Sequence, residues 1–559
     1  MNSFNLYHGL FAQKRLGFTA VRYEQREISY RALRNEVLHV AEVLKLLDIG
    51  TGDRVALLLH DSPEFIAAFV AVVSIGAIAV PINMGLSREE QRFILKDCGA
   101  QTAIVEADAC AALFGNSRQP ADKLKDDPLL PDLNDLLLVK RTEAAPAFDF
   151  AGLRTQLWDS DAVKDGDGAP DAEDAEEFAA KRQERLLSLR CDADSPAFIL
   201  YTSGSTGEPK GAIHTQAHID YTKRTYCAEV LRLREGDRLF SSSRLPFAYG
   251  LGNSFTFPLL NGHTTILCRE KPLPDVIGRV FQDYRPTIFF GVPVVYRMLL
   301  DHHRNVSELD CSSLRLCISA GEALPAQLGE EWQRTFGVEV LDGIGSTEML
   351  HMFFSNHEGE VRYGSSGRSV GGYEAKLIDH EGNPTPDGEV GNLWIRGASA
   401  APGYWHRPET TAQTFVDGWV RTGDLYRRDG DDFWWHMGRS DDCFKPTGQW
   451  VSPIEVEGVL LRHQEVSRAA VVEGFDDAGL SCVCAFVVTS DTNRDRVSVE
   501  AALRALVEKA LPRFKRPRRY IFVSELPYTA TGKIQRFKLR EQLRGSEFKV
   551  QVVGDSRTN

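Results

Sequence analysis

The stretch Tyr201-Thr-Ser-Gly-Ser-Thr-Gly-Glu-Pro-Lys-Gly211 contains more hydroxyl and glycine residues than packing alone requires. An apolar run at 197–200 precedes it and Ala212-Ile213 follows it, so we expect the glycines to turn between two strands. Gly204 and Gly207 let backbone N–H groups approach phosphate oxygens, because no Cβ stands in the way. The same stretch supplies hydroxyl donors and a cation: Thr202, Ser203, Ser205, Thr206 and Lys210. It therefore predicts a loop that holds a triphosphate.

This loop differs from a Walker motif, in which the lysine is followed by Ser or Thr at the start of a helix. Here Gly211 follows Lys210. A flexible Gly/Ser linker is the alternative explanation for such a composition. The apolar flanks and the single lysine make the linker the weaker of the two explanations.

The composition is that of an ordinary soluble globular chain, with 559 residues, 43% of them hydrophobic and 26% charged. Such a length exceeds a single hydrophobic core, so we expect more than one domain. The formal net charge of −13 argues against a nucleic-acid partner, because phosphate backbones require a basic face. The 10 cysteines are scattered, which predicts neither a zinc site nor a disulfide framework and fits a reducing cytoplasm.

No membrane or secretory segment is expected. The N-terminus lacks a basic region followed by an apolar core, so we predict a cytoplasmic protein. The apolar stretch 65–80 is shorter than the ~20 residues of a spanning helix, and Gly76 and Pro81 interrupt it. We interpret it as a buried helix that begins near Ser62-Pro63-Glu64, followed by a short core strand.

Helix and strand patterns alternate from Val21 to about Val105, which predicts a parallel sheet with helices on both faces. The regular pattern weakens over 116–189, and Asp and Glu crowd 159–177. We interpret this region as an acidic surface insertion, mobile and dispensable at 159–177. An acidic docking segment for a partner is the alternative.

A second glycine-rich stretch, Asp342-Gly-Ile-Gly-Ser-Thr-Glu348, follows a predicted strand at 338–341. Mg²⁺ needs a hard oxygen ligand, so Glu348 is the candidate metal ligand and Thr347 the candidate contact to the α-phosphate. The alternative is a helix start, in which Ser346 or Thr347 caps and Glu348 favours the dipole. Both explanations can hold together.

Asp424 follows Gly423 at the end of a predicted strand at 419–424. An ionised carboxylate in that place can accept both hydroxyls of a ribose, whereas a plain turn is the alternative. Lys533 follows Gly532 in an exposed turn near the C-terminus. On chemistry alone it is a solvated lysine.

Together these stretches resemble the adenylate-forming superfamily, which includes acyl-CoA synthetases, peptide-synthetase adenylation domains and luciferases. The resemblance covers most of the chain and implies an α/β fold with two parts. Residues 1–438 would form a large adenylation domain of parallel and mixed sheets flanked by helices, with a β-rich subdomain. Residues 439–559 would form a small mobile α+β domain on a hinge at Asp441. ATP, Mg²⁺ and coenzyme A are the implied cofactors and co-substrates.

The resemblance also assigns residues to the nucleotide and to coenzyme A. The predicted strand end Ser319-Ala320-Gly321-Glu322 would cradle the adenine, and Asp342 and Gly343 would also bind the nucleotide. Arg439 would reach the ribose or a phosphate, and Gly448 would lie beside the pantetheine arm. The lysine at 533 would bridge the attacking carboxylate and the phosphate.

The string Phe247-Ala248-Tyr249-Gly250 resembles the aryl pocket of benzoate–CoA ligases, in which a flat ring lies beside the tyrosine. The small residues Ala248, Gly250 and Gly345 would leave a flat space for the ring of the acid, and His351 would lie near that ring. Taken alone, this histidine is more often a packing residue. We therefore expect an aryl-carboxylate–CoA ligase that takes a small aromatic acid, with benzoate and 2-aminobenzoate equally favoured. A carrier-loading adenylation enzyme and a non-catalytic nucleotide-binding protein are the alternatives, and a homodimer stays open.

Overall fold

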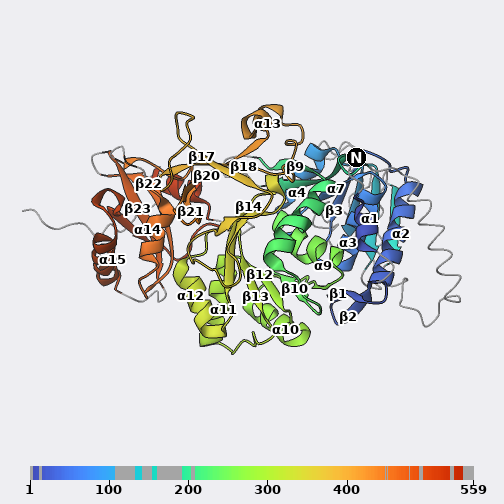
Figure 1. The fold of residues 1–559 in the computed structure, drawn as a ribbon, viewed down its shortest axis with the longest axis horizontal. Coiled ribbons are helices and arrows are strands. Elements are labelled where there is room, and N and C mark those ends of the chain that lie inside the picture. Colours follow the sequence, from blue (N-terminus) through green and yellow to red (C-terminus); the bar gives the residue numbers. More distant parts are fainter. Residues whose placement is uncertain are drawn as a thin grey trace, which may run out of the picture.

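The structure is a computed structural model that describes residues 4–11, 15–107, 133–140, 154–159, 192–202, 208–446, 449, 451–476, 479–489, 495–528 and 534–544. Figure 1 shows helices α1 to α3 at one end of an elongated molecule and the C-terminal elements β22, β23 and α15 at the other. Strand β14 and the β-rich part around β18 and β20 lie between these ends. Among the described residues, no helix has both the length and the apolar character needed to cross a membrane.

The predicted phosphate loop belongs to a sheet with the order β7-β6-β5-β3-β4-β8-β9 among the described residues. Its neighbouring strands are parallel except for the antiparallel pair β8 and β9. The alternating helix and strand pattern therefore predicts this parallel sheet correctly. The bounds are β3 Arg54–Leu58, β4 Ile78–Pro81, β5 Thr102–Glu106, β6 Asp135–Lys140, β7 Arg154–Asp159, β8 Pro196–Thr202, β9 Lys210–Thr215, α2 Tyr30–Leu46, α3 Pro63–Ser74 and α4 Arg88–Cys98.

Helix α3 is the core helix that the apolar stretch predicts. Ser62 caps it by accepting a hydrogen bond from the Phe65 N–H, and Pro63 occupies its first position. Every residue of the helix is buried. A helix that is apolar on all sides needs packing on all sides, and here sheet strands and α2 supply it.

The region interpreted as an acidic insertion contains two strands of the sheet. Strands β6 and β7 lie inside 116–189 and extend the parallel sheet, so the interpretation is wrong for these two segments. Strand β6 is a short apolar run and β7 has only two adjacent apolar residues, and neither shows the alternation that would mark a strand. Residues 160–177, where the mobile and dispensable segment was expected, lie outside the described residues.

A second sheet packs beside the first and has the order β16-β15-β14-β13-β12-β10-β11-β1-β2 among the described residues. Its central strands, from β1 through β11, β10, β12 and β13 to β14, are parallel. The strand bounds are β1 Thr19–Tyr23, β2 Arg26–Ser29, β10 Arg238–Ser241, β11 Thr264–Ile266, β12 Ile288–Gly291, β13 Leu316–Ser319, β14 Val340–Gly345, β15 Met352–Ser355 and β16 Arg368–Ser369.

Helical segments connect these strands and cover the sheet. Their bounds are α1 Leu6–Leu10, α7 Gln216–Thr222, η5 Lys223–Leu231, α8 Ala248–Leu251, η6 Gly252–Thr256, α9 Phe257–Leu260, α10 Pro274–Tyr284, α11 Pro293–Asn305, α12 Ala326–Phe336 and η7 Thr347–Met349. Segments η5 and η6 are π-helical and η7 is a single 3₁₀ turn.

The remaining elements form the β-rich part and the C-terminal domain, as the resemblance implies. The β-rich part is antiparallel and contains β17 Glu374–Ile378, β18 Val390–Arg396, α13 Pro408–Thr414, β19 Phe415–Val416, β20 Trp419–Arg428 and β21 Trp434–Arg439. The C-terminal domain contains α14 Pro453–Leu460, β22 Val466–Phe475, β23 Ser481–Thr489, α15 Arg496–Ala510, η9 Arg513–Lys515, β24 Arg519–Phe522 and α16 Arg536–Arg544. It has its own apolar core.

Three local predictions need correction. The aromatic pair and the small residues of 245–254 predict a short turn, but in the structure this stretch enters a continuous helical segment that runs from Ala248 to Leu260. Strand β14 continues through the glycine-rich stretch to Gly345, because that stretch pairs with β15. Strand β20 likewise continues beyond Asp424, which pairs with Arg439 of β21.

Candidate active site

The phosphate loop closes a hairpin between β8 and β9. Thr202 and Lys210 are paired across the two strands, so both ends of the loop lie side by side. The loop residues Ser203, Gly204, Ser205, Thr206 and Gly207 lie outside the described residues. A Cβ on Gly211 would lie 2.6 Å from Ile199 Cγ2, so only glycine fits after the lysine. The hairpin that the sequence predicts is therefore confirmed, and the loop's phosphate contacts stay a prediction.

Tyr404 joins the two predicted phosphate-binding motifs. Its hydroxyl donates a hydrogen bond to Glu348 Oε1 at 2.6 Å. The Nζ atom of Lys210 lies 5.7 Å from the centroid of the same tyrosine ring, within the range of a cation–π interaction. Two backbone contacts hold the tyrosine beside β9, a bridge to Ala212 and a hydrogen bond from the N–H of residue 405 to the carbonyl of residue 211. Lys210 and Glu348 therefore both contact Tyr404, the lysine at the ring face and the glutamate at the hydroxyl.

The 3₁₀ turn η7 carries Thr347 and Glu348, and the protein holds it at several backbone atoms. Ser346 caps it by accepting from the Met349 N–H at 3.3 Å, so the helix-start alternative also holds. The N–H of Ala401 donates to the Glu348 carbonyl at 2.8 Å. The hydroxyl of Ser399 donates to the carbonyl of the following Met at 2.8 Å. The carboxylate at 348 therefore projects from a fixed turn.

The donor set at this turn fits Mg²⁺. Glu348 is half-buried, and its carboxylate accepts the hydrogen bond of Tyr404 at Oε1. Among the described residues, no group of three His, Cys, Asp or Glu side chains is arranged to hold a metal ion. Mg²⁺ is commonly held by one or two carboxylates together with substrate phosphates and water, so a single carboxylate beside a phosphate loop matches its preference.

Asp342 and Ser319 lie side by side at the predicted adenine site, where Ser319 ends β13 and pairs with Asp342 at the last parallel position of β14. Asp342 is buried, and its Oδ2 accepts from the Leu324 N–H at 3.3 Å. Burial raises the pKa of this carboxyl to about 8. Gly321 adopts φ +94°, which strains any residue with a Cβ, and Ala320 next to it is buried. Ligands of open α/β sheets bind at such strand ends.

Gly343 and Glu322 are the other residues assigned to the nucleotide. A Cβ on Gly343 would overlap the carbonyl oxygen of Phe354 on the neighbouring strand β15. This glycine is therefore explained by strand packing, and its contact with a nucleotide stays a prediction. Glu322 is half-buried at the same edge of the sheet as Gly321.

Asp424 and Arg439 form an ion pair at the predicted ribose site. Arg439 Nη1 lies 3.3 Å from Asp424 Oδ1, and His436 Nε2 lies 3.4 Å from the same oxygen. Burial lowers the pKa of Arg439, but Asp424, Asp441 and Glu348 outweigh it and raise the net value. The Arg439 guanidinium is thus influenced by the charges of Asp424, the predicted ribose ligand, and Glu348, the predicted Mg²⁺ ligand. The sequence places these groups in separate motifs, and the structure brings them together.

Tyr249 is the second residue of helix α8, and its side chain points toward the strand ends of the large sheet. Its hydroxyl donates toward the carbonyls of Gly291 and Ile318, both at 3.3 Å. Burial raises its pKa well above the ordinary value, so it stays a neutral donor. Phe247 lies half-buried just before this helix, and Ala248 is buried.

His351 lies behind Tyr249 in an aromatic cage. Its ring centroid is 4.7 Å from that of Tyr226, 4.6 Å from that of Phe257 and 5.9 Å from that of Tyr249. Burial lowers the pKa of the imidazole to about 3, so it is neutral at physiological pH. A Cβ on Gly252 would lie 2.5 Å from the ring, so this glycine makes room for it. Tyr226 had no motif that could mark it in the sequence.

The two glycines of the predicted aryl slot have a different structural role from the one expected. A Cβ on Gly250 would overlap the carbonyl oxygen of Arg244, and one on Gly345 would overlap that of His351. Both glycines permit close backbone packing, and neither opens empty space in the direction of its missing side chain. Whether they border a bound ring stays a prediction.

The residues expected from the C-terminal domain are only partly described. Lys533 and Gly448 lie outside the described residues, whereas Asp441 is exposed in the turn after β21. The segment around the lysine is bounded by a bridge between Tyr528 and Ile534. Burial raises the pKa of Tyr528, and the charge of Glu322 raises it further. Tyr528 therefore lies within the electrostatic influence of Glu322, which follows the predicted adenine strand.

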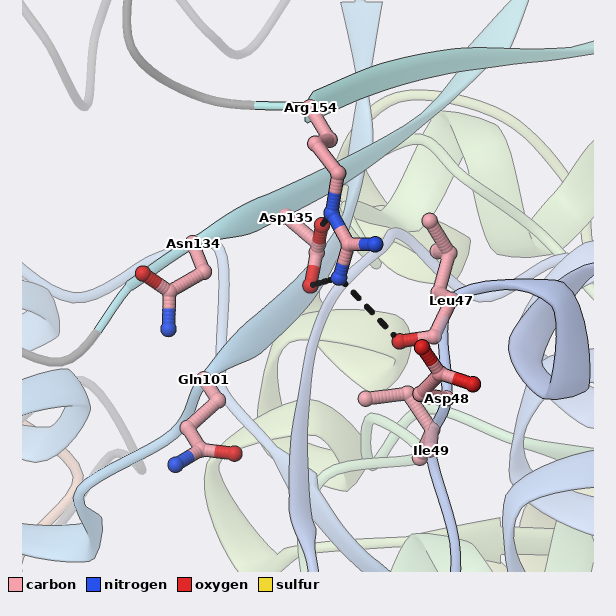
Figure 2. Close-up of a pocket in the computed structure, with 7 residues that line it drawn as sticks. All are labelled: Leu47, Asp48, Ile49, Gln101, Asn134, Asp135 and Arg154. Atoms are coloured by element: carbon pink, nitrogen blue, oxygen red, sulfur yellow. Dashed lines mark hydrogen bonds and ion pairs between the residues drawn. The ribbon is translucent and has the colours of Figure 1, made fainter.

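An open cavity of about 420 Å³ lies elsewhere, at the amino ends of β5, β6 and β7. Figure 2 shows Arg154 reaching across it to Asp135 and to the carbonyl of Leu47, with an Arg154 Nε to Asp135 Oδ1 distance of 2.6 Å. The phosphate hairpin lies at the opposite, carboxyl end of β8. The cavity is thus separate from the candidate active site.

The hairpin around the predicted phosphate loop, the strand residues assigned to the nucleotide and the separate C-terminal domain agree with comparisons to known proteins. The model of the AMP-binding enzyme family matches residues 11–405. The chain belongs to the AMP-binding enzyme family. The C-terminal domain model of AMP-binding enzymes matches residues 455–533 as well.

Several members of the AMP-binding enzyme family resemble the whole chain. A benzoate–CoA ligase of Thauera aromatica is 38% identical over 88% of this chain and 86% of its own length. An anthranilate–CoA ligase of Pseudomonas aeruginosa is 34% identical over 93% of each chain. The crystal structure of the anthranilate CoA ligase AuaEII in complex with anthranoyl-AMP superposes with a TM-score of 0.84, 34% identity and 97% coverage of each chain. The chain is accordingly an AMP-forming acid–thiol ligase.

Proposed function

We propose that the protein is an ATP-dependent aryl-carboxylate–CoA ligase that takes benzoate or 2-aminobenzoate, forms an aryl-AMP and releases pyrophosphate and AMP. The observation that carries the proposal is the convergence of Lys210 and Glu348 on Tyr404, with Arg439 in the same field. The relatives named for benzoate and anthranilate support the aryl acid.

The first half-reaction is in-line attack of a carboxylate oxygen on the α-phosphorus of ATP. Two anions must meet, so the site has to neutralise charge before the bond forms. Lys210 at the base of the loop and Lys533 on the C-terminal hairpin would each neutralise part of it. Glu348 would hold Mg²⁺, which neutralises phosphate charge when bound. Thr347 would donate to the α-phosphate, and Asp424 would accept from the ribose hydroxyls.

The second half-reaction is attack of the coenzyme A thiol on the carbonyl carbon of the aryl-AMP, with AMP as the leaving group. During adenylation the segment that carries Lys533 would lie at the nucleotide side of the site, where it would block the thiol; the charge of Glu322 acting on Tyr528, which precedes that segment, supports this placement. Rotation of the small domain about Asp441 would remove it and bring the loop at Gly448 to the site, which is a hinge motion.

The aryl specificity would come from Tyr249 and its aromatic surroundings. Tyr249, Phe290 and His351 form an aromatic wall whose polar groups are engaged or neutral. A ring gains from edge or face contact with such a wall, whereas a long flexible chain gains less and loses more entropy on binding.

Incubation with ATP, Mg²⁺, coenzyme A and a panel of acids tests the proposal directly. We expect AMP and an aryl thioester to form together. Aryl-AMP without thioester would instead indicate a carrier-loading adenylation enzyme. ATP binding without either product would indicate a non-catalytic nucleotide-binding protein.

The panel also tests which acid the site prefers. An apolar slot that accepts both acids should discriminate between benzoate and 2-aminobenzoate by only about 1–3 kcal/mol, whereas a buried acceptor for the amine would reject benzoate more strongly. The kcat/KM values for benzoate, 2-aminobenzoate and 4-hydroxybenzoate decide between these outcomes. A higher kcat/KM for octanoate than for all three would contradict the aryl slot.

A further inference from the structure

The face of strand β9 that carries Lys210 also carries a group that contacts the predicted metal-binding turn. Side chains alternate along a strand, so Lys210, Ala212 and His214 share one face. His214 is fully buried and its Nε2 lies 2.8 Å from the carbonyl oxygen of Thr347. Its ring is stacked against Phe198 with centroids 5.3 Å apart. Stacking on Phe198 therefore fixes the plane of the imidazole, and its Nε2 contacts the backbone of turn η7.

The contacts of His214 determine where its proton lies. A carbonyl oxygen only accepts, so Nε2 of His214 must carry hydrogen to bond Thr347. In the neutral ring Nδ1 is then an acceptor, and His218 Nδ1 lies 3.0 Å from it. Two bare nitrogens at that distance would repel, so His218 Nδ1 must carry hydrogen. A longer 3.4 Å contact from the Thr215 N–H to the same His218 atom is weaker and does not reverse this assignment.

Both rings are neutral, as this chain of donors requires. Burial lowers the pKa of His214 to about 3, the neighbouring His218 lowers it further, and the Thr347 carbonyl opposes them. Burial lowers the pKa of His218 to about 4. The hydrogen bonds therefore run in one direction, from His218 to His214 to the backbone of turn η7.

We propose that His214 is a positioning residue for Thr347 and Glu348, and that His218 fixes the Nε2–H tautomer of His214. The proposal rests on the proposed function for the roles of the threonine and the glutamate. His214 and Lys210 both belong to strand β9, so the hydrogen bond of His214 fixes turn η7 to the strand that carries Lys210. The hairpin and the metal-binding turn then keep a constant separation while the phosphates are bound.

Substitution of His214 separates this role from simple packing. His214→Phe keeps the ring against Phe198 and removes the donor, so we expect aryl-AMP formation to slow about 10- to 100-fold and its half-saturating Mg²⁺ concentration to rise. His214→Gln places an amide N–H near the former Nε2 and should restore most of the rate. Pyrophosphate release at varied Mg²⁺ measures both quantities. His302→Phe is a matched control. His302 is also buried, belongs to helix α11 away from turn η7, and lies with its Nε2 2.7 Å from Ser307 Oγ.

Substitution of His218 tests the tautomer. His218→Leu leaves His214 Nδ1 without its donor and should populate the Nδ1–H form, with a slower rate of aryl-AMP formation. His218→Asn offers a replacement donor and should reverse both effects. ¹⁵N NMR of histidine-labelled protein distinguishes the two tautomers without any substrate, and the wild type should show Nε2–H at His214.

Three results would overturn the proposal: an Nδ1–H tautomer in the wild type, a His214→Gln variant as slow as His214→Phe, or unchanged Mg²⁺ dependence in a folded His214→Phe protein. If the wild type forms no aryl-AMP with any acid, the proposed function fails instead. The NMR measurement still decides the tautomer in that case. The His218 variants also decide it if His214→Phe does not fold.

Discussion

Lys533→Ala should lower the rate of aryl-AMP formation by about 10²–10³-fold, the cost of removing one preorganised charge from a transition state. The residue comes between the bridged residues Tyr528 and Ile534, and Tyr528 lies within the electrostatic influence of Glu322. From that position its ammonium would lie between the attacking carboxylate and the α-phosphate. With ready-made aryl-AMP and coenzyme A, the variant should still make thioester, because that step needs the hairpin elsewhere.

Pyrophosphate release measures the first half-reaction, and thioester formed from supplied aryl-AMP measures the second. Lys538→Ala is a matched control, because Lys538 is an exposed lysine on the adjacent helix α16. It should leave both half-reactions close to the wild-type rates. Near-normal adenylation by Lys533→Ala would remove that lysine from the mechanism.

Asp441→Pro should lower thioester formation about 100-fold while leaving adenylation nearly intact. Asp441 is exposed in the turn between β21 and the bridge of Phe444 with Val451. Its neighbours hold the turn, since the Ser440 N–H donates to the Gly423 carbonyl at 2.9 Å. Proline fixes φ and restricts the preceding residue, so the chain cannot change direction here. A two-state equilibrium held at 99:1 leaves about 1% of the molecules in the second pose.

Asp441→Ala serves as the control, because alanine removes the carboxylate but keeps the backbone free. It should retain most of both half-reactions. Single-turnover measurements of each step, with the proline and alanine variants side by side, separate a backbone effect from a charge effect. Equal loss of adenylation and thioester formation in the proline variant would count against a hinge at this residue.

The sequence allows the scaffold of the site to be predicted because local rules determine it. The helix after Ser62 and the strands around the phosphate loop follow from hydrophobic periodicity, proline at a helix start and glycine at a turn. The carboxyl-end position of the nucleotide residues follows from the parallel order of the sheet. The family resemblance carries the rest, including the two parts of the chain.

The contacts that complete the site are not local, so no motif shows them. The contact of His214 with Thr347 spans 133 residues, and that of Tyr404 with Glu348 spans 56. Tyr404 lies in Gly403-Tyr404-Trp405, a sequence typical of an ordinary structural turn. The glycines at 250 and 345 are misread for a related reason, since a sequence gives the absence of a side chain but not the backbone that occupies its place.

Glu322 links the two domains electrostatically in this pose. Burial lowers the pKa of Arg536, but Glu457, Asp442 and Glu322 outweigh burial, and of these Glu322 comes from the large domain. The rotation about Asp441 that we propose for the second half-reaction would therefore separate these opposite charges. Interactions across such a gap weaken as the Debye length falls from about 8 Å at 0.15 M salt to about 3 Å at 1 M. Ionic strength should consequently act as an external control on the domain equilibrium, with added salt favouring the thioester-forming pose.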